Sequence, residues 1–322
     1  MRALVTGCAG FIGSQLTESL LADGCDVVGI DCFNDNYGRA QKLRNLARAR
    51  NWDDFDFVPI DLSRGDLHEF VCDCDTLFHL AAEPGVRSSW GARFETYVRN
   101  NVVATQHLLD AAATCPEKRF VYASSSSIYG QAETFPTPED SRPQPLSPYG
   151  VTKLAAEHLC GLYRANYGVS TVSLRLFSVY GPRQRPDMAF TTFCRAAIER
   201  TPVTVFGDGQ QTRDFTYVDD VVSAIRLAAK AEGVEGRVYN VGGGSRISLN
   251  SALDALSRLV GRSLDVRYVE RGHGEVRDTG AETSRARAEL GFVPTARFED
   301  GLSRQFEWAL EEFAGPGRAQ LA

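Results

Sequence analysis

Long apolar runs, an excess of basic residues and metal-ligand spacings are all missing from this 322-residue sequence. No segment approaches the ~18 consecutive apolar residues of a membrane span, and no signal-peptide pattern is present, so we expect a cytoplasmic protein without a membrane partner. Basic residues number 35 against 41 acidic ones, which gives a net charge of −6. Because nucleic-acid binding needs a net basic surface, this balance argues against nucleic acid as the main partner.

Cysteine and histidine are present, but in no pattern that binds metal. The eight cysteines are scattered, and the Cys72–Cys74 pair has the wrong spacing for a zinc site and no second pair to complete it. The five histidines also lack ligand spacing, and His79, at the end of an apolar run, is expected to be a hydrogen-bonded core residue. We therefore predict no metal and, from the burial habits of cysteine, reduced thiols in the core.

What the sequence does contain is an alternation of short β-branched runs with longer helical patterns. Apolar runs such as Leu4–Val5 and Leu77–Phe78 are nearly continuous, as in parallel strands that are covered on both faces. The order predicts an α/β fold with a doubly wound parallel sheet of Rossmann type. The predicted strands are Arg2–Thr6, Asp26–Ile30, Asp56–Ile60, Thr76–Leu80, Arg119–Ser124 and Thr171–Leu176, and the predicted helices are Ile12–Ala22, Tyr37–Arg50, Phe94–Ala113 and Tyr149–Tyr167.

Past about residue 180 the alternation loosens, and glycine, proline and arginine become frequent. We expect residues 1–178 to form the dinucleotide-binding domain, which also receives segments from about 213–243. Residues 179–314 should form mainly a smaller α/β domain that supplies the other wall of a cleft. The glycine- and proline-containing residues 315–322 are expected to be a flexible tail.

The glycine cluster Gly7, Gly10 and Gly13 directly follows the first predicted strand and opens the first predicted helix. Glycines at this turn let a pyrophosphate approach the backbone N–H groups of a helix N-terminus. Asp31 stands at the end of the second predicted strand, where a carboxylate accepts hydrogen bonds from ribose hydroxyls and repels a 2′-phosphate. These residues predict an NAD site rather than an NADP site; the alternative is a structural turn with a surface aspartate.

Tyr149 and Lys153 are four residues apart in a predicted helix, which Ser147 and Pro148 start as N-cap and first helical residue. This spacing puts the phenol and the ammonium on one helix face, where the ammonium lowers the pKa of the phenol and lets it act as a base. Lys153 is also one of only four lysines in the chain. On spacing alone such a pair is more often a solvated helix face, so only the accompanying motifs make it informative.

Together these motifs resemble those of the extended short-chain dehydrogenase/reductase family. Nearly the whole chain is similar to the nucleotide-sugar 4-epimerases of that family, and in particular to UDP-glucuronate 4-epimerases. The resemblance implies an isomerase that oxidises a UDP-sugar at C4 with a retained NAD, lets the 4-keto sugar turn and reduces its other face. The segments that carry the resemblance most specifically are His79–Arg87, Ser126–Gly130, Tyr180–Phe190 and Arg213–Asp220.

The resemblance also implies roles for individual positions. The catalytic residues would be Tyr149 as the base, Lys153 as its partner and Ser125 as a hydrogen-bond partner of the sugar 4-oxygen. NAD would be bound by Gly7, Gly10, Phe11, Ile12, Gly13, Asp31, Asn34, Asn36, Asp61, Leu62, Leu80, Ala81, Ala82, Asn100, Tyr149, Lys153 and Phe177. The UDP-sugar would be bound by Ser125, Ser126, Ser127, Tyr149, Ser178, Arg185, Met188, Ala189, Phe190, Val205, Phe206 and Arg213, with Arg271 and Arg277 as rivals for a further diphosphate contact.

Ser126 and Ser127 bear on which reaction follows the oxidation. Similar sugar dehydratases carry an acidic pair in this region and UDP-glucuronate decarboxylases carry a glutamate, because elimination needs an acid and a base in addition to the tyrosine. Neither serine serves in those roles at neutral pH. Dehydration is therefore not expected, and decarboxylation lacks its helper.

Arg185 bears on the choice between a uronate and a neutral sugar. By resemblance it approaches the C6 carboxylate, and a guanidinium fits a carboxylate in a bidentate manner; the alternative is a loop arginine in a surface ion pair. Arg183 and Gln184 depart from plant-type glucuronate enzymes, which keeps UDP-glucose 4-epimerase open as an alternative. UDP-glucuronate decarboxylase and a non-catalytic NAD(H)-binding protein follow. The resemblance further implies a homodimer through a four-helix interface formed by residues 94–113 and 149–167.

Overall fold

The computed structural model describes residues 1–313, so the predicted flexible tail, 315–322, lies outside the described residues. At the centre of the fold is a seven-stranded parallel sheet in the order β11-β6-β5-β4-β1-β2-β3. The predicted Rossmann-type sheet is confirmed: β1 and β2 have the predicted bounds, and the ends of the other four predicted strands differ by at most two residues. The strands are β1 (Arg2–Thr6), β2 (Asp26–Ile30), β3 (Phe55–Val58), β4 (Thr76–His79), β5 (Arg119–Ser125), β6 (Ser170–Leu176) and β11 (Val238–Val241).

Helices cover both faces of the sheet, which is why its strands are apolar almost throughout. Successive residues point to opposite faces, so Leu4 packs in one core cluster and Val5 in the other. One face is covered by α1 (Phe11–Ala22) and α8 (Val218–Lys230), which pack against each other. On the other face lie α3 (His68–Cys72), α5 (Ala104–Ala112) and α6 (Pro148–Tyr167).

Two predicted helices are less regular than the sequence indicates. The predicted helix Tyr37–Arg50 is α2 (Arg39–Leu46) followed by a short 3₁₀ turn, η1 (Ala49–Asn51). The predicted helix Phe94–Ala113 consists of α4 (Phe94–Tyr97) and α5, joined by a π-helical segment, η4 (Val98–Val103). Such wider turns inside helices often lie at functional sites.

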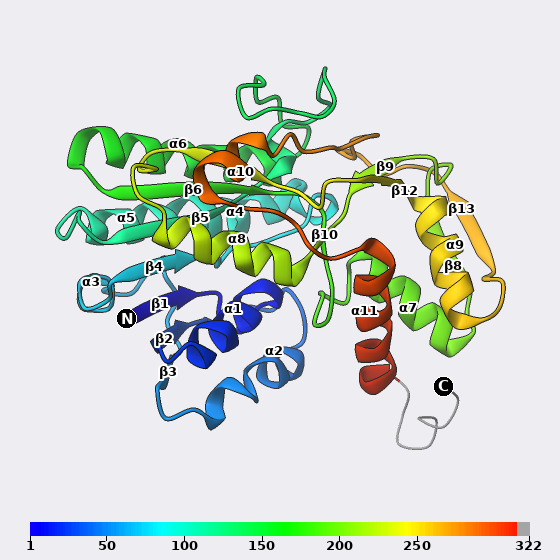
Figure 1. Cartoon of the computed structure of the whole chain (residues 1–322), viewed down its shortest axis with the longest axis horizontal. Coiled ribbons are helices and arrows are strands. Elements are labelled where there is room, and N and C mark those ends of the chain that lie inside the picture. The colour runs from blue at the N-terminus through cyan, green and yellow to red at the C-terminus, as the bar shows by residue number, and fades with distance from the viewer. Residues whose placement is uncertain (314–322) are drawn as a thin grey trace.

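Beyond β6 the chain builds a smaller set of elements and then returns to the sheet. Figure 1 shows α7, α9 and α11 grouped at the right of the sheet, with β8, β9, β12 and β13 around them. Helix α10 packs against β11, and α11 packs against α7. These elements are β7 (Val179–Tyr180), α7 (Ala189–Glu199), β8 (Val203–Phe206), β9 (Thr212–Asp214), β10 (Thr216–Tyr217), β12 (Arg246–Ser248), α9 (Leu249–Val260), β13 (Val266–Val269), α10 (Ser284–Leu290) and α11 (Phe298–Phe313).

A buried polar network joins α6, β5, β6 and β11. Arg175 of β6 and Glu157 of α6 form an ion pair at 2.6 Å, and both side chains are less than a tenth exposed. The Ser124 hydroxyl donates to the same carboxylate at 2.6 Å. One Arg175 N–H donates to the Tyr129 hydroxyl, which in turn donates to Asn240 of β11. Because each buried charge has partners, the network holds the ends of these strands in fixed positions.

Cys72 and Cys115 correct the prediction that the cysteines are all reduced. Helix α3 packs against α5, and this brings the two residues, which are 43 apart in sequence, into a disulfide with a Cα–Cα distance of 5.8 Å. No local pattern in the sequence signals this contact, because it depends on how two helices meet. The other six cysteines are free, and all but Cys32 are buried.

Two further observations bear on partners. No helix within residues 1–313 has both the length and the apolar character to cross a bilayer. The helices of the predicted dimer interface, α4, α5 and α6, lie on one face of the sheet, and Val151 and Leu162 of α6 are exposed there. The homodimer itself stays a prediction.

Candidate active site

A cleft of about 980 Å³ opens at the carboxyl ends of β1, β2, β4 and β5. Its opposite wall is formed by α7, β8 and the loop that precedes α10. Its volume lies at the upper end of the range for small-molecule sites, and the carboxyl edge of a doubly wound sheet is where such folds bind ligands. Almost every residue that the sequence singles out lines this cleft; the exceptions are Phe177, Val205, Arg271 and Arg277.

The glycine turn between β1 and α1 leaves room for a phosphate group. Gly7 has φ +72°, and a Cβ on this residue would lie 2.8 Å from the backbone nitrogen of Ala81. Helix α1 begins without a side-chain cap and without an acidic residue in its first turn, and its first residues, Phe11, Ile12 and Gly13, line the cleft. An uncapped N-terminus of this kind suits the pyrophosphate of a dinucleotide.

We expect Gly13→Ala to unfold this turn and to abolish NAD binding. A Cβ on Gly13 would lie 2.1 Å from the Gly7 carbonyl oxygen, so α1 has to move away from β1. Urea denaturation should show a loss of about 3 kcal/mol, and the purified variant should release no NAD on heating. Gly161→Ala is the matched control: a Cβ there meets nothing within 4 Å, so stability should rise by up to about 1 kcal/mol. A Gly13→Ala protein with normal stability and bound NAD would contradict this account.

Asp31 lies at the end of β2, where the adenosine ribose of a dinucleotide would sit. Its side chain is 9% exposed and accepts a hydrogen bond of 2.8 Å from the Phe33 N–H. Lys42 lies 3.7 Å from the same carboxylate and also hydrogen-bonds Asn34. Lys42 lines the cleft too, although the sequence does not single it out.

The π-helical segment η4 places two adjacent asparagines in different roles. The Asn101 side chain is buried: it accepts from the Glu83 N–H at 2.6 Å and donates to the Glu83 carbonyl and to Thr152 of α6. Asn100 instead lines the cleft. The segment thus ties the loop after β4 to α6 and leaves Asn100 at the cleft.

His79 is a hydrogen-bonded core residue, as predicted. Its Nδ1 lies 2.8 Å from Thr6 Oγ1 and its Nε2 lies 2.9 Å from Thr105 Oγ1. Thr105 donates its own proton to the Asn101 carbonyl, so Nε2 is the protonated ring nitrogen and donates to Thr105. Burial, with a smaller effect of the Lys153 charge, lowers the pKa of His79 to about 3. The ring therefore stays neutral and links the end of β1 to α5.

Ser125, Tyr149 and Lys153 all line the cleft, and Ser125 hydrogen-bonds Tyr149. Ser125 ends β5, while Tyr149 and Lys153 lie on the first two turns of α6, which starts at the Ser147 N-cap with a hydrogen bond of 3.1 Å from the Gly150 N–H. Burial raises the pKa of Tyr149, whereas its hydrogen bond with Ser125 and the charge of Arg185 act in the opposite direction. Lys153 is not among the groups in residues 1–313 that shift the pKa of Tyr149, so the predicted lowering of this pKa by Lys153 is not found.

Lys153 is itself buried, with 3% of its surface exposed. Its ammonium lies 4.4 Å from the centre of the Tyr122 ring, and burial lowers its pKa to about 7. Lysine side chains are rarely buried this deeply, because burial of the ammonium costs free energy. A buried lysine with a shifted pKa at a cleft is therefore a candidate for a functional role.

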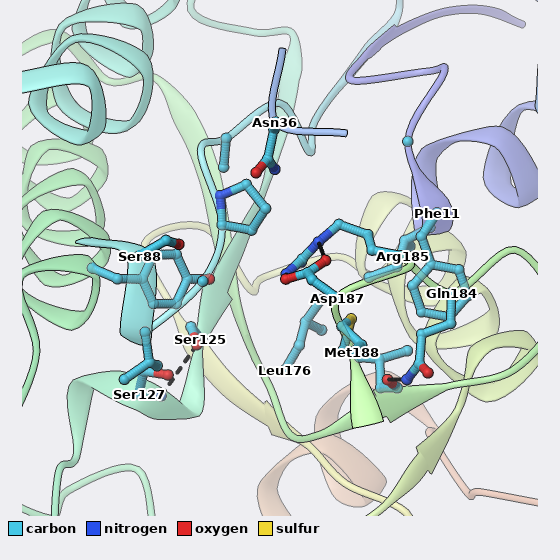
Figure 2. Close-up of a pocket in the computed structure, with 18 of the residues that line it drawn as sticks. Phe11, Asn36, Ser88, Ser125, Ser127, Leu176, Gln184, Arg185, Asp187 and Met188 are labelled. Carbon is cyan, nitrogen blue, oxygen red and sulfur yellow. Dashed lines mark hydrogen bonds and ion pairs between the residues drawn. The ribbon is translucent and has the colours of Figure 1, made fainter. Parts of the chain in front are cut away.

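Arg185 lies on the opposite wall from the predicted catalytic Ser125. Figure 2 shows Ser125 and Ser127 on one side of the cleft and Arg185, Asp187 and Met188 on the other. The Arg185 guanidinium holds the Asp187 carboxylate with two hydrogen bonds, 3.0 Å from Nε to Oδ1 and 2.8 Å from Nη2 to Oδ2. Only 16% of the Arg185 side chain is exposed.

The far end of the cleft holds a second group of charged residues. Arg213 donates to the backbone carbonyls of Thr212, Val276 and Arg277, and burial lowers its pKa. Arg87 has its guanidinium 3.6 Å from the centre of the Phe206 ring and pairs with Glu275. The sequence assigns no role to Arg87, although this residue ends the segment His79–Arg87. Arg87, Phe206, Arg213 and Glu275 all line the cleft.

The predicted residues outside the cleft have clear positions elsewhere. Phe177 is 1% exposed and packs against Tyr129, because Leu176 and Ser178 on either side of it face the cleft. Val205 is completely buried in the core next to β8's cleft-facing Phe206. Neither arginine rival lines the cleft. Arg271 donates to the Glu275 carbonyl at 3.4 Å, and Arg277 lies within 4 Å of Asp208 and Asp278.

The glycine turn, the uncapped helix, and Tyr149 and the buried Lys153 on one cleft-lining helix are typical of a dinucleotide-dependent enzyme of the short-chain dehydrogenase type. Residues 3–242 match the NAD dependent epimerase/dehydratase family, and the chain belongs to that family. Within it, the protein is an NAD-dependent nucleotide-sugar 4-epimerase, an isomerase, so the predicted class and the predicted cofactor are confirmed.

Individual relatives cover nearly the whole chain. An uncharacterized UDP-glucose epimerase of Bacillus subtilis, YtcB, is 40% identical over 98% of this chain and 100% of its own length. The crystal structure of UDP-glucuronic acid 4-epimerase from Bacillus cereus in complex with UDP-glucuronic acid and NAD is 41% identical, covers 97% of this chain and 100% of that one, and has a TM-score of 0.94. MoeE5 is 40% identical and has a TM-score of 0.87 in two structures, one in complex with UDP-glucose and NAD and one in complex with UDP-glucuronic acid and NAD. Both structures cover 97% of this chain; the match covers 99% of the MoeE5 chain in the first structure and 100% in the second.

Proposed function

We propose that the protein interconverts UDP-glucuronate and UDP-galacturonate. The observation that carries this proposal is Arg185, a nearly buried guanidinium that faces Tyr149 across the cleft and already binds a carboxylate in bidentate geometry. A sugar whose C4 lies at Tyr149 would bring its C6 substituent to this wall. A guanidinium matches the shape and charge of a C6 carboxylate and has no comparable partner in a C6 hydroxyl.

The protein's groups divide the work as follows. Tyr149 accepts the proton of the sugar 4-hydroxyl and returns it, with Ser125 holding the 4-oxygen. Bound NAD supplies the reversible oxidation at C4. Lys153 contributes a positive charge at the point where negative charge develops on the phenol. Arg87, Arg213 and Phe206 would hold the UDP end, so that the sugar ring can turn while the nucleotide stays fixed.

Arg185 has a second task in this reaction, because the oxidised uronate is a β-keto acid that loses CO₂ readily. Decarboxylation disperses the carboxylate charge, and an ion pair to that charge stabilises the intact acid. Ser126 and Ser127 line the cleft and offer no acid–base pair that would divert the intermediate. A serine in place of glutamate there also separates this chain from the decarboxylase pattern.

The direct test is to incubate the purified protein with UDP-glucuronate, without added NAD, and to follow the anomeric protons by NMR. Formation of UDP-galacturonate supports both the reaction and a retained cofactor. UDP-pentose as the main product, or conversion of UDP-glucose alone, would overturn the proposal. No turnover of either sugar even with added NAD would indicate a binding protein.

We expect Arg185→Ala to raise KM for UDP-glucuronate at least about tenfold and to release some UDP-pentose. The variant loses the charge that binds the carboxylate and that opposes its loss as CO₂. Both effects can be read in one NMR time course at several substrate concentrations. Wild-type KM and no UDP-pentose would place the carboxylate elsewhere.

UDP-glucose is the second candidate substrate, and one observation favours it. Asp187 already balances the Arg185 charge, so a neutral C6 group does not leave that guanidinium unpaired. The name of YtcB as a UDP-glucose epimerase and the MoeE5 complex with UDP-glucose agree with this second candidate.

A further inference from the structure

The Arg185–Asp187 pair contains a conflict with the proposed substrate. Arg185 offers five N–H donors on a rigid fork, and the edge formed by Nε and Nη2 is already bonded to Asp187. Within residues 1–313, Asp187 is the one side chain that hydrogen-bonds this guanidinium. The phenols of Tyr149, Tyr37 and Tyr97 are further titratable groups that interact with its charge. An incoming carboxylate therefore meets an arginine whose charge is already neutralised.

The two partners differ in how firmly they are held. The Arg185 side chain is 16% exposed, whereas the Asp187 side chain is 57% exposed. Figure 2 shows both at the same wall, with the guanidinium directed into the cleft. Burial raises the pKa of Asp187, but the hydrogen bonds and charge of Arg185 lower this pKa by a larger amount. The net pKa lies below its ordinary value, so the carboxylate stays ionised at neutral pH. Asp187 is thus a permanent negative charge that can turn toward solvent while Arg185 stays in place.

We propose that Asp187 is a specificity-determining residue that sets how well this enzyme distinguishes a uronate from a neutral hexose. The inference rests on the proposed function, in which Arg185 receives the C6 carboxylate. A uronate has to displace Asp187 or share the guanidinium with it, and the two carboxylates repel each other. A neutral sugar leaves the Arg185–Asp187 pair intact, so no unpaired charge is buried on binding.

Asp187 therefore weakens uronate binding and supports binding of the neutral sugar. Specificity is a difference between two affinities, and this one residue acts on both in opposite directions. The Asp187 carboxylate would let the site accept both UDP-glucuronate and UDP-glucose. The preference for UDP-glucuronate would then be smaller than the preference that Arg185 would give without Asp187.

The test is Asp187→Asn, which keeps the size of the side chain and one hydrogen-bond acceptor but removes the charge. We expect KM for UDP-glucuronate to fall about threefold or more and KM for UDP-glucose to rise by a similar factor. The ratio of the two kcat/KM values should then shift about tenfold toward the uronate. The effect should fall on KM rather than on kcat, because the substitution leaves Tyr149 and Lys153 untouched.

Two variants separate this effect from a structural one. Asp187→Glu keeps the charge and should restore a ratio close to that of the wild type. Asp219→Asn removes a carboxylate of similar exposure, 61%, that pairs with Arg304 outside the cleft, and should leave the ratio unchanged.

The outcomes distinguish this inference from the function on which it rests. A wild-type enzyme that epimerises UDP-glucuronate, together with an Asp187→Asn ratio within about twofold of the wild type, overturns the role of Asp187 alone. An equal fall in kcat with both substrates would mean that the residue is structural and would also overturn it. A wild-type enzyme inert toward UDP-glucuronate overturns both proposals.

Discussion

Tyr149→Phe should lose at least about a thousandfold in kcat while it still binds both NAD and the nucleotide sugar. The substitution removes one oxygen, the group that accepts the proton of the 4-hydroxyl, and keeps the ring that packs edge-on against Tyr97 with 6.3 Å between the ring centres. Because the pKa of Tyr149 is raised by burial, the protein does not hold this phenol ionised by itself. The proton therefore has to move within the reaction, and a phenylalanine at this position has no oxygen to accept it.

Three measurements on the same variant test this prediction. Turnover is followed by NMR, bound NAD is quantified after heat release, and binding of UDP is measured by calorimetry. Tyr163→Phe removes a hydroxyl from the same helix at a position bonded to Asp110 outside the cleft, so its activity should stay within about twofold of the wild type. If Tyr149→Phe kept about a tenth of the wild-type kcat, Tyr149 would not be the base.

Lys153→Met should have two opposite effects: activity falls by at least about a hundredfold, and the cofactor-free protein becomes more stable. The activity falls because, in the proposed mechanism, Lys153 supplies the positive charge that stabilises the phenol oxygen as it gains negative charge. The stability rises because burial lowers the pKa of Lys153 to about 7 from an ordinary 10.5, so folding has to strip the proton or bury the charge. At pH 7 the gain should be on the order of 2–4 kcal/mol in urea denaturation.

The pH dependence of that gain has a definite sign. The folded-state pKa of Lys153 lies below the unfolded-state value, so the lysine's destabilising effect is fully present below pH 7. It shrinks as the pH rises from 7 and is lost near pH 10.5. The stability advantage of Lys153→Met should shrink in the same way. Lys118→Met, at a partly exposed lysine outside the cleft, should show no comparable trend, and a gain that is independent of pH would contradict the buried-charge explanation.

The parts of the site that could be predicted from the sequence are those set by local geometry. Gly7, Gly13 and Asp31 follow directly from strand–turn–helix order, since each sits within a few residues of a strand end or in the helix that follows. The positions of Tyr149 and Lys153 on one helix are predictable because Ser147 fixes where α6 begins and therefore which residues share a face. In these cases a few neighbouring residues carry enough information.

The parts that were missed depend on contacts between distant segments. Arg87, Phe206 and Glu275 meet only because β8 and the loop before α10 close over the end of the sheet. The direction of the Phe177 side chain was also missed: its neighbours on both sides face the cleft, and backbone alternation turns the Phe177 ring into the core. The pairing of Cys72 with Cys115 likewise required knowledge of helix packing.

The position of β11 has a consequence for synthesis on the ribosome. This strand supplies the outermost position of the sheet next to β6, yet it begins at Val238. Until that point of the chain emerges, β6 is an open edge, and unpaired edges readily join other chains. The hydrogen-bond network around Arg175 on β6 is also incomplete until then, because the Tyr129 hydroxyl that Arg175 contacts is bonded to Asn240 of β11. The nascent chain thus carries an incomplete nucleotide-binding half for much of its translation, and its dependence on chaperones should be greatest over that interval.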